Sequence, residues 1–200
     1  MPARAFEIGS NVNGQPIGHA RFDPFFEACE ALGAAVFVHA LKPAGMDRLV
    51  GPAPLQQVLA YPTDVGLAAA SVITRNLIER RPGLRIAFSH DGGTLAMLLP
   101  RLEQARNVFA PLGESLRAAP SKQARKLYYD TLVFDEPTLR HLLHCFGDTQ
   151  LMIGTDYPFN FSEQRPVARI EAACADAGVQ DRLVHGNALR FLGRAAQVAA

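Results

Sequence analysis

Three short apolar segments of the sequence each end in a side chain that can bind a metal ion or carry a proton. Residues 34–38 precede His39, residues 84–89 precede His90, and residues 151–155 precede Asp156. Imidazole nitrogens and carboxylate oxygens are common ligands of zinc and similar divalent cations, and histidine also moves protons near neutral pH. A single histidine in this position is usually a hydrogen-bonded core residue. Three repeats of the pattern in one chain favour a shared site.

Asp156 has two interpretations. It follows an apolar run and Gly154-Thr155, and Pro158 comes two residues later. Proline has no N–H group for a central strand, so we expect the strand to end near Asp156. The carboxylate would then lie at the C-terminal end of a buried strand, where ligands collect in α/β folds. Alternatively, the side chain caps the turn or helix that follows.

These residues are expected on alternating strands and helices. The predicted strands cover residues 4–9, 34–38, 84–89, 127–134 and 151–155. The predicted helices cover residues 23–32, 63–80, 94–107, 136–146, 165–177 and 187–192. Alternation of this kind predicts a parallel sheet covered by helices, and the nearly continuous apolar strands indicate burial on both faces. A doubly wound open sheet and part of a (β/α)8 barrel both fit.

Composition narrows the class of protein. The 200 residues are 48% hydrophobic and 20% charged, so we expect one domain over residues 1–200. The formal net charge of +1 and the absence of basic runs argue against nucleic acid and membrane surfaces as partners. We expect no membrane span, a cytoplasmic location and three reduced cysteines. No glycine-rich nucleotide motif is present.

Other features are weaker signals. Residues 42–62 form a Pro/Gly-rich segment that is longer than a connection requires, as in lids and substrate loops. His141 and His144 lie three residues apart in a predicted helix, a spacing that can bind metal but more often marks a solvated face. His19 and His185 have no partner in the sequence.

The motifs together resemble the amidohydrolase-related (amidohydrolase 2) family. The resemblance is carried by Phe37-Val38-His39, Ser89-His90-Asp91-Gly92-Gly93, Tyr128-Tyr129-Asp130-Thr131, Gly154-Thr155-Asp156-Tyr157-Pro158-Phe159 and Gly186-Asn187-Ala188-Leu189-Arg190-Phe191-Leu192-Gly193. Within the family, the sequence is most similar to aminocarboxymuconate-semialdehyde decarboxylase-like proteins. The resemblance extends over essentially the whole chain and implies a (β/α)8 TIM barrel, of which these residues would form strands 4–8.

The resemblance also implies roles for four residues. His39 and Asp156 would bind one divalent metal ion, usually zinc, and Asp156 would belong to the catalytic centre together with His90. His90 would be the acid/base that moves a proton beside metal-activated water. Arg101 would reach the carboxylate of a substrate in the neighbouring subunit, which suggests a homodimer. The expected reaction is decarboxylation or hydrolysis of a small unsaturated or aromatic carboxylic acid.

The sequence departs from the family pattern in two places. It contains no His-x-His pair, which in this family lies on the first strand and completes the metal site. About three N-terminal βα units are therefore expected to be missing, and the metal site to be incomplete. Asp91 replaces a glycine in the turn after His90. The sequence thus supports a metal-dependent enzyme, an inactive partial barrel that acts as a binding or assembly module, or an open-sheet protein with buried histidines.

Overall fold

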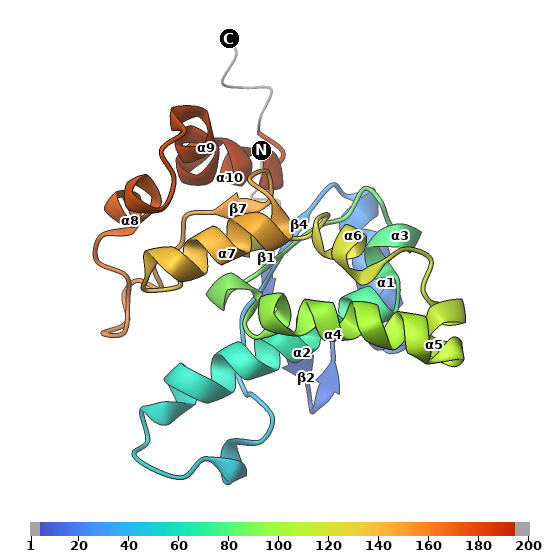
Figure 1. Cartoon of the computed structure of the whole chain (residues 1–200). Coiled ribbons are helices and arrows are strands. Elements are labelled where there is room, and N and C mark those ends of the chain that lie inside the picture. Colours follow the sequence, from blue (N-terminus) through green and yellow to red (C-terminus); the bar gives the residue numbers. More distant parts are fainter. Residues whose placement is uncertain (1–4, 195–200) are drawn as a thin grey trace.

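The computed structural model describes residues 5–194, which form a parallel sheet covered by helices (Figure 1). The sheet has five strands in the order β1-β4-β5-β6-β7. Their bounds are β1 Ala5–Ile8, β4 Ala35–Val38, β5 Arg85–Phe88, β6 Tyr128–Asp130 and β7 Leu151–Met152. A separate antiparallel pair, β2 Asn11–Val12 and β3 Gln15–Pro16, follows β1.

Helices connect successive strands. Their bounds are α1 Asp23–Ala31, α2 Tyr61–Thr74, α3 Leu77–Arg80, α4 Leu95–Val108, α5 Ala110–Ser115, α6 Pro120–Ala124, α7 Glu136–Phe146, α8 Pro166–Ala173, α9 Ala177–Asp181 and α10 Asn187–Phe191. In Figure 1, α2, α4 and α7 lie on one side of the sheet. Among the described residues, no helix combines the length and the apolar character that a membrane crossing requires.

The strand order distinguishes between the two predicted architectures. Every neighbouring pair in the sheet is parallel, and the spatial order follows the chain order without a reversal. A doubly wound sheet reverses its strand order at a switch point, whereas a (β/α)8 barrel adds each strand beside the preceding one. The described chain is therefore a partial barrel, as predicted.

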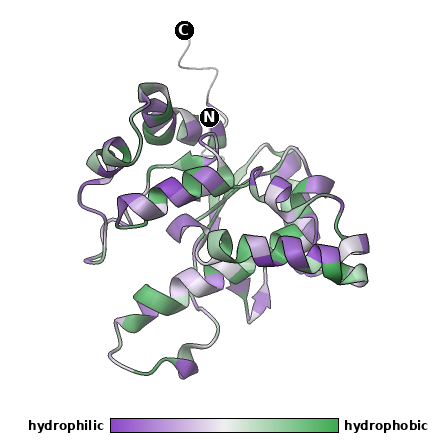
Figure 2. Cartoon of the chain, viewed as in Figure 1, coloured by the Kyte–Doolittle hydropathy of each residue, from purple (hydrophilic) through white to green (hydrophobic). Residues whose placement is uncertain are grey.

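Alternate residues of the strands supply two apolar cores. Val36 and Val38 of β4 face the main core beneath the helices, whereas Ala35 belongs to a smaller cluster on the opposite face. Phe191 of α10 closes that cluster by packing against Tyr128, with 5.4 Å between the ring centroids. In Figure 2 the strands are coloured mainly hydrophobic and the helices carry both colours, in agreement with burial of both sheet faces.

Four predicted elements differ from the observed ones. The helix expected over 165–177 covers only Pro166–Ala173. The strand expected to end near Asp156 ends at Met152, and the strand expected over 127–134 covers only Tyr128–Asp130. The helix expected over 63–80 is broken at Asn76, which is left-handed and whose side chain bonds to the backbone of Ser115 at the end of α5 and of Arg117 just after it. Local hydrophobic periodicity carries no information about these tertiary contacts.

The predicted long loop also contains regular structure. A short 3-10 turn covers Met46–Arg48, and a π-helical turn over Gln56–Ala60 runs directly into α2. The helix therefore begins before residue 63, and only part of the segment is irregular.

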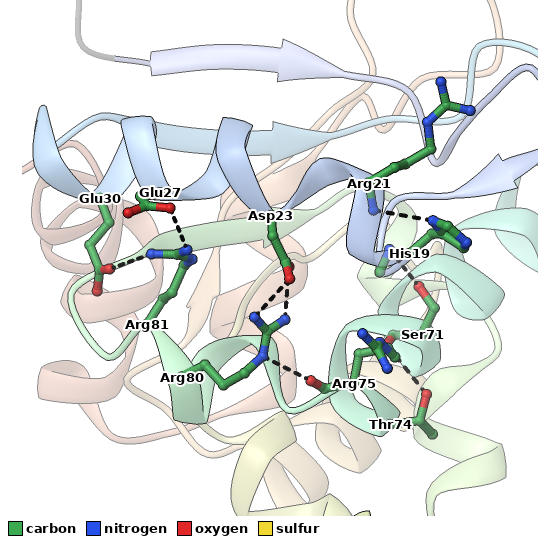
Figure 3. Close-up of polar contacts among 11 residues, drawn as sticks. His19, Arg21, Asp23, Glu27, Glu30, Ser71, Thr74, Arg75, Arg80 and Arg81 are labelled. Carbon is green, nitrogen blue, oxygen red and sulfur yellow. Dashed lines mark hydrogen bonds and ion pairs between the residues drawn. The ribbon is translucent and has the colours of Figure 1, made fainter.

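Ion pairs tie α1 to α3 and to the turn that follows it (Figure 3). Arg80 donates two hydrogen bonds to the carboxylate of Asp23, at 3.0 and 2.9 Å, and Arg81 contacts both Glu27 and Glu30. Bidentate pairs of this kind are among the stronger surface interactions. They anchor α1 before the chain enters β4, the strand that leads to His39.

Candidate functional site

The structure brings His39, His90 and Asp156 together at the C-terminal edge of the sheet. One donor atom from each of these residues lies within 4.8 Å of the other two. His39 Nε2 is 3.6 Å from Asp156 Oδ1, and the two imidazole rings have centroids 4.9 Å apart. The side chains that follow the three strands therefore lie close together, as predicted.

The parallel ladder continues through His39 and through Ser89, the residue that precedes His90. The His39 N–H donates to the carbonyl of Ile8 at 3.0 Å, and the Ser89 N–H donates to the carbonyl of Val38 at 2.9 Å. Both residues thus continue the hydrogen bonding of the sheet just beyond the strands. Ser89 Oγ lies 3.0 Å from His90 Nδ1, which leaves Nε2 of the same ring for the site.

Two groups in the site have shifted pKa values. Burial lowers the pKa of the His90 imidazole to about 4, with His39 adding to the shift and Asp156 opposing it. Burial raises the pKa of the Asp91 carboxyl to about 8, with the nearby Asp130 adding to the shift and a backbone hydrogen bond from Gly93 opposing it. At neutral pH the His90 ring is therefore neutral and able to accept a proton.

Asp156 lies at the start of a turn, but its side chain does not cap that turn, because the Tyr157 N–H donates to Thr155 Oγ1 instead. The Asp156 backbone is left-handed, with φ of 60°, and its carbonyl accepts a hydrogen bond from the Phe159 N–H at 3.0 Å, so it begins a turn. Its carboxylate nevertheless faces His39. The turn directs the backbone away from the sheet while the side chain stays at the site.

A cavity of about 350 Å³ opens over these polar groups. His39, His90, Asp91 and Asp156 lie in its wall, together with the Tyr61 ring. The rest of the wall is mainly apolar and includes Leu41, Val58, Leu132, Phe134, Phe159 and Phe161. A cavity whose wall has a few polar groups together and is otherwise mainly apolar suits a small molecule that has one polar end and one flat apolar part.

The donor set fits a divalent metal ion. Tetrahedral zinc with ligand bonds near 2.05 Å would hold its donor atoms about 3.3 Å apart. The 3.6 Å between His39 Nε2 and Asp156 Oδ1 is close to that separation. His39 and Asp156 therefore supply two of the three protein ligands that a catalytic zinc site usually has, with the His90 ring beside them.

Arg101 is not brought to this cavity. It lies exposed on α4 and lines a separate hollow that Leu98 and Leu102 share. Its expected contact with a substrate in a neighbouring subunit stays a prediction.

Asp130 is not among the site residues predicted from the sequence. Residues 127–134 are predicted as a strand and Tyr128-Tyr129-Asp130-Thr131 contributes to the family resemblance, but neither observation assigns a role to Asp130. The structure places this carboxylate directly beneath the turn that carries His90. The signal available in the sequence was an acidic residue at the end of an otherwise apolar strand.

The chain is similar to known proteins over most of its length. The family model described as "Amidohydrolase" matches residues 2–194. The 2-amino-3-carboxymuconate-6-semialdehyde decarboxylase of Dictyostelium discoideum is 35% identical, over 94% of this chain and 52% of that protein. The Caenorhabditis elegans protein of the same name is 27% identical, over 96% and 56%. The chain thus spans about half the length of the curated relatives it matches.

Solved structures share the fold. The 5-carboxyvanillate decarboxylase LigW from Sphingomonas paucimobilis is 26% identical with a TM-score of 0.82, over 95% of this chain and 58% of that chain. The apo IDCase of Metarhizium anisopliae is 22% identical with a TM-score of 0.83, over 96% and 57%. A dihydroxybenzoic acid decarboxylase from Polaromonas sp. JS666, solved with bound manganese, is 20% identical with a TM-score of 0.75, over 90% and 57%.

Proposed function

The chain belongs to the amidohydrolase family, and we propose that it supplies the metal- and proton-handling part of a divalent-metal-dependent decarboxylase. The observation that carries this proposal is the convergence of His39, His90 and Asp156 in one largely apolar cavity. The relatives named above as decarboxylases favour carbon–carbon cleavage over hydrolysis. The substrate would be a small aromatic or unsaturated carboxylic acid.

Each part of the cavity has a role in this proposal. His39 and Asp156 would hold the metal ion, which we propose is zinc, and the ion would supply Lewis-acid stabilisation of negative charge on the substrate. The apolar wall, including Phe134 and Phe161, whose ring centroids are 4.8 Å apart, would hold the flat part of the substrate and exclude water.

His90 would move the proton. Its neutral ring can take a proton from water or from a substrate hydroxyl and deliver it to the carbon that bears the carboxylate. The bond from that carbon to the carboxylate then breaks, its electron pair remains with the organic product, and CO₂ leaves. The negative charge of the carboxylate then remains on the oxygen that gave up the proton, and the apolar surroundings favour release of the uncharged CO₂.

The proposal also covers the location, the oligomeric state and the partners of the chain. We propose a cytoplasmic homodimer in which Arg101 of each copy faces the partner, with no nucleic acid or membrane involved. The near-neutral formal charge of +1 supports the last point. Light scattering coupled to size-exclusion chromatography would measure the mass in solution, and a monomer at micromolar concentration would contradict the dimer.

Metal analysis tests the central proposal. The chain would be stripped with a chelator, exposed to Zn²⁺ or Mn²⁺, desalted and measured by mass spectrometry for bound metal. We expect about one ion per chain, lost in His39→Ala and Asp156→Ala. His185→Ala is the matched control, because that histidine is 70% exposed and lies outside the cavity.

The same preparations would be tested for CO₂ release from 2-hydroxybenzoate and related ring acids. A folded chain that takes up no metal under these conditions would contradict the enzyme proposal. That result would favour the alternative, an inactive partial barrel that acts as a binding or assembly module.

A further inference from the structure

We propose that Asp130 is a positioning residue that fixes the positions of His90 and Asp156 relative to each other. Asp130 is the last residue of β6 and is only 7% exposed. It is not part of the cavity wall, so it does not touch a bound molecule there. Its effect on the site would act entirely through the two neighbouring segments.

The first segment is the turn that carries His90. Asp130 Oδ2 accepts a hydrogen bond from the His90 N–H at 2.9 Å. Oδ1 accepts from the Asp91 N–H at 2.8 Å and from the Leu132 N–H at 3.1 Å. A single carboxylate therefore satisfies three buried backbone donors, two of which belong to the turn.

This turn needs external support. His90 and Asp91 have φ of 50° and 56°, so two consecutive residues with a Cβ are left-handed. The left-handed conformation is unfavourable for residues other than glycine and persists only where surrounding contacts enforce it. The hydrogen bonds to Asp130 fall on these two residues and supply that enforcement.

The second segment leads to Asp156. A Cβ added at Gly154 would lie 2.6 Å from Asp130 Cβ and 3.1 Å from its carboxyl carbon. The backbone therefore passes directly against the Asp130 side chain, two residues before Asp156. Asp130 thus contacts both arms of the site, and neither arm can shift without disturbing its side chain.

The inference rests on the proposed function only in assuming that His90 and Asp156 belong to a metal and proton-transfer site. Its first test therefore uses a readout that needs no metal. Asp130→Asn keeps the size of the side chain but replaces one accepting oxygen with an NH₂ group that cannot accept. We expect hydrogen exchange at the His90 and Asp91 amides to quicken about tenfold or more in the metal-free chain. The ring resonances of His39 and His90 should also shift, because their separation changes.

A second readout is Zn²⁺ affinity. Residues that orient metal ligands typically change affinity by about 10–100-fold when replaced, and we expect a loss in this range for Asp130→Asn. Gly154→Ala, which pushes the same side chain from the other arm, should reproduce the shifts at both histidine rings. It also provides a second variant should Asp130→Asn fail to fold.

Asp23→Asn is the matched control for general destabilisation. It removes the ion pair between α1 and Arg80 outside the cavity (Figure 3), and it should leave the His90 amide, the ring resonances and Zn²⁺ affinity unchanged. Unchanged exchange and ring resonances in Asp130→Asn, or equal changes in Asp23→Asn, would overturn the inference. Absence of metal from the unmodified chain would contradict only the proposed function.

Discussion

Gly93, which ends the turn after His90, is expected to be intolerant of a side chain. Its backbone has φ of 60° and ψ of −127°, a region that is essentially restricted to glycine. An added Cβ would also lie 1.8 Å from the carbonyl oxygen of Pro62 and 2.9 Å from the Gly66 nitrogen. Gly93→Ala therefore introduces backbone strain and a collision with the first turn of α2.

The Gly147→Ala variant separates backbone strain from the collision with α2. Gly147 also has a backbone conformation that favours glycine, with φ of 87° and ψ of 173°, but an added Cβ would meet no atom within 4 Å. Gly147→Ala should therefore show the conformational strain alone, about 1–3 kcal/mol. For a chain of this size, about 2 kcal/mol corresponds to a fall in melting temperature of about 6 °C.

Gly93→Ala should lose roughly twice as much stability. Ordinary carbon–oxygen contacts are near 3.3 Å, so the backbone around Pro62 must move by roughly 1.5 Å. Overpacking of this kind adds about 1–3 kcal/mol, which brings the total near 4 kcal/mol and the fall in melting temperature to about 12 °C. Because Tyr61 and Pro62 lie in the cavity wall, the variant should also change the environment of the Tyr61 ring.

Thermal unfolding followed by circular dichroism would measure both variants, and aromatic NMR would report on Tyr61. Equal falls in melting temperature for Gly93→Ala and Gly147→Ala would refute the argument, since they would show that contact with α2 adds nothing. A larger fall for Gly147→Ala would refute it more strongly.

Three further predictions concern single side chains. A hydrogen bond from Arg80 holds the pKa of Asp23 below its ordinary value of 3.8. The pair therefore stabilises the fold above about pH 4 and loses this contribution as the pH falls through the lowered pKa. Asp23→Asn should lower the free energy of unfolding by about 1 kcal/mol at pH 7, and an equal loss at pH 3 in urea titrations would contradict the pairing. Tyr129→Phe removes a buried hydrogen bond to the Ala124 carbonyl at 2.9 Å and should reduce stability by about 1–2 kcal/mol in the same assay, so an unchanged midpoint would count against that bond. Arg101→Ala alters an exposed side chain outside the cavity and should change stability by less than about 0.5 kcal/mol; a larger loss in urea titration would show that this side chain supports the fold.

The sequence was informative where local chemistry decides the structure. The helix over 136–146 was predicted with its bounds, because Asp135 is a strong N-cap and its side chain accepts from the Thr138 N–H as expected. The convergence of His39, His90 and Asp156 was also predictable, because parallel strands place their C-terminal ends at one edge of the sheet.

The remaining features depend on contacts between distant segments. Asn76 breaks a helix because its side chain bonds to the backbone of Ser115 and Arg117, about 40 residues away. The contact between Asp130 and the backbone at Gly154 likewise joins two separate βα units. Hydrophobic periodicity describes one segment at a time and cannot register such pairings.

The agreement between strand order and chain order bears on how the site arises during synthesis. β1, β4, β5, β6 and β7 lie side by side in the order in which a ribosome releases them, so each new strand can dock on the exposed edge of the preceding one. His39 and His90 can therefore meet before β7 and Asp156 have been translated. Asp156 arrives last, and a nascent chain stalled before that residue would hold both imidazoles without the carboxylate that faces His39.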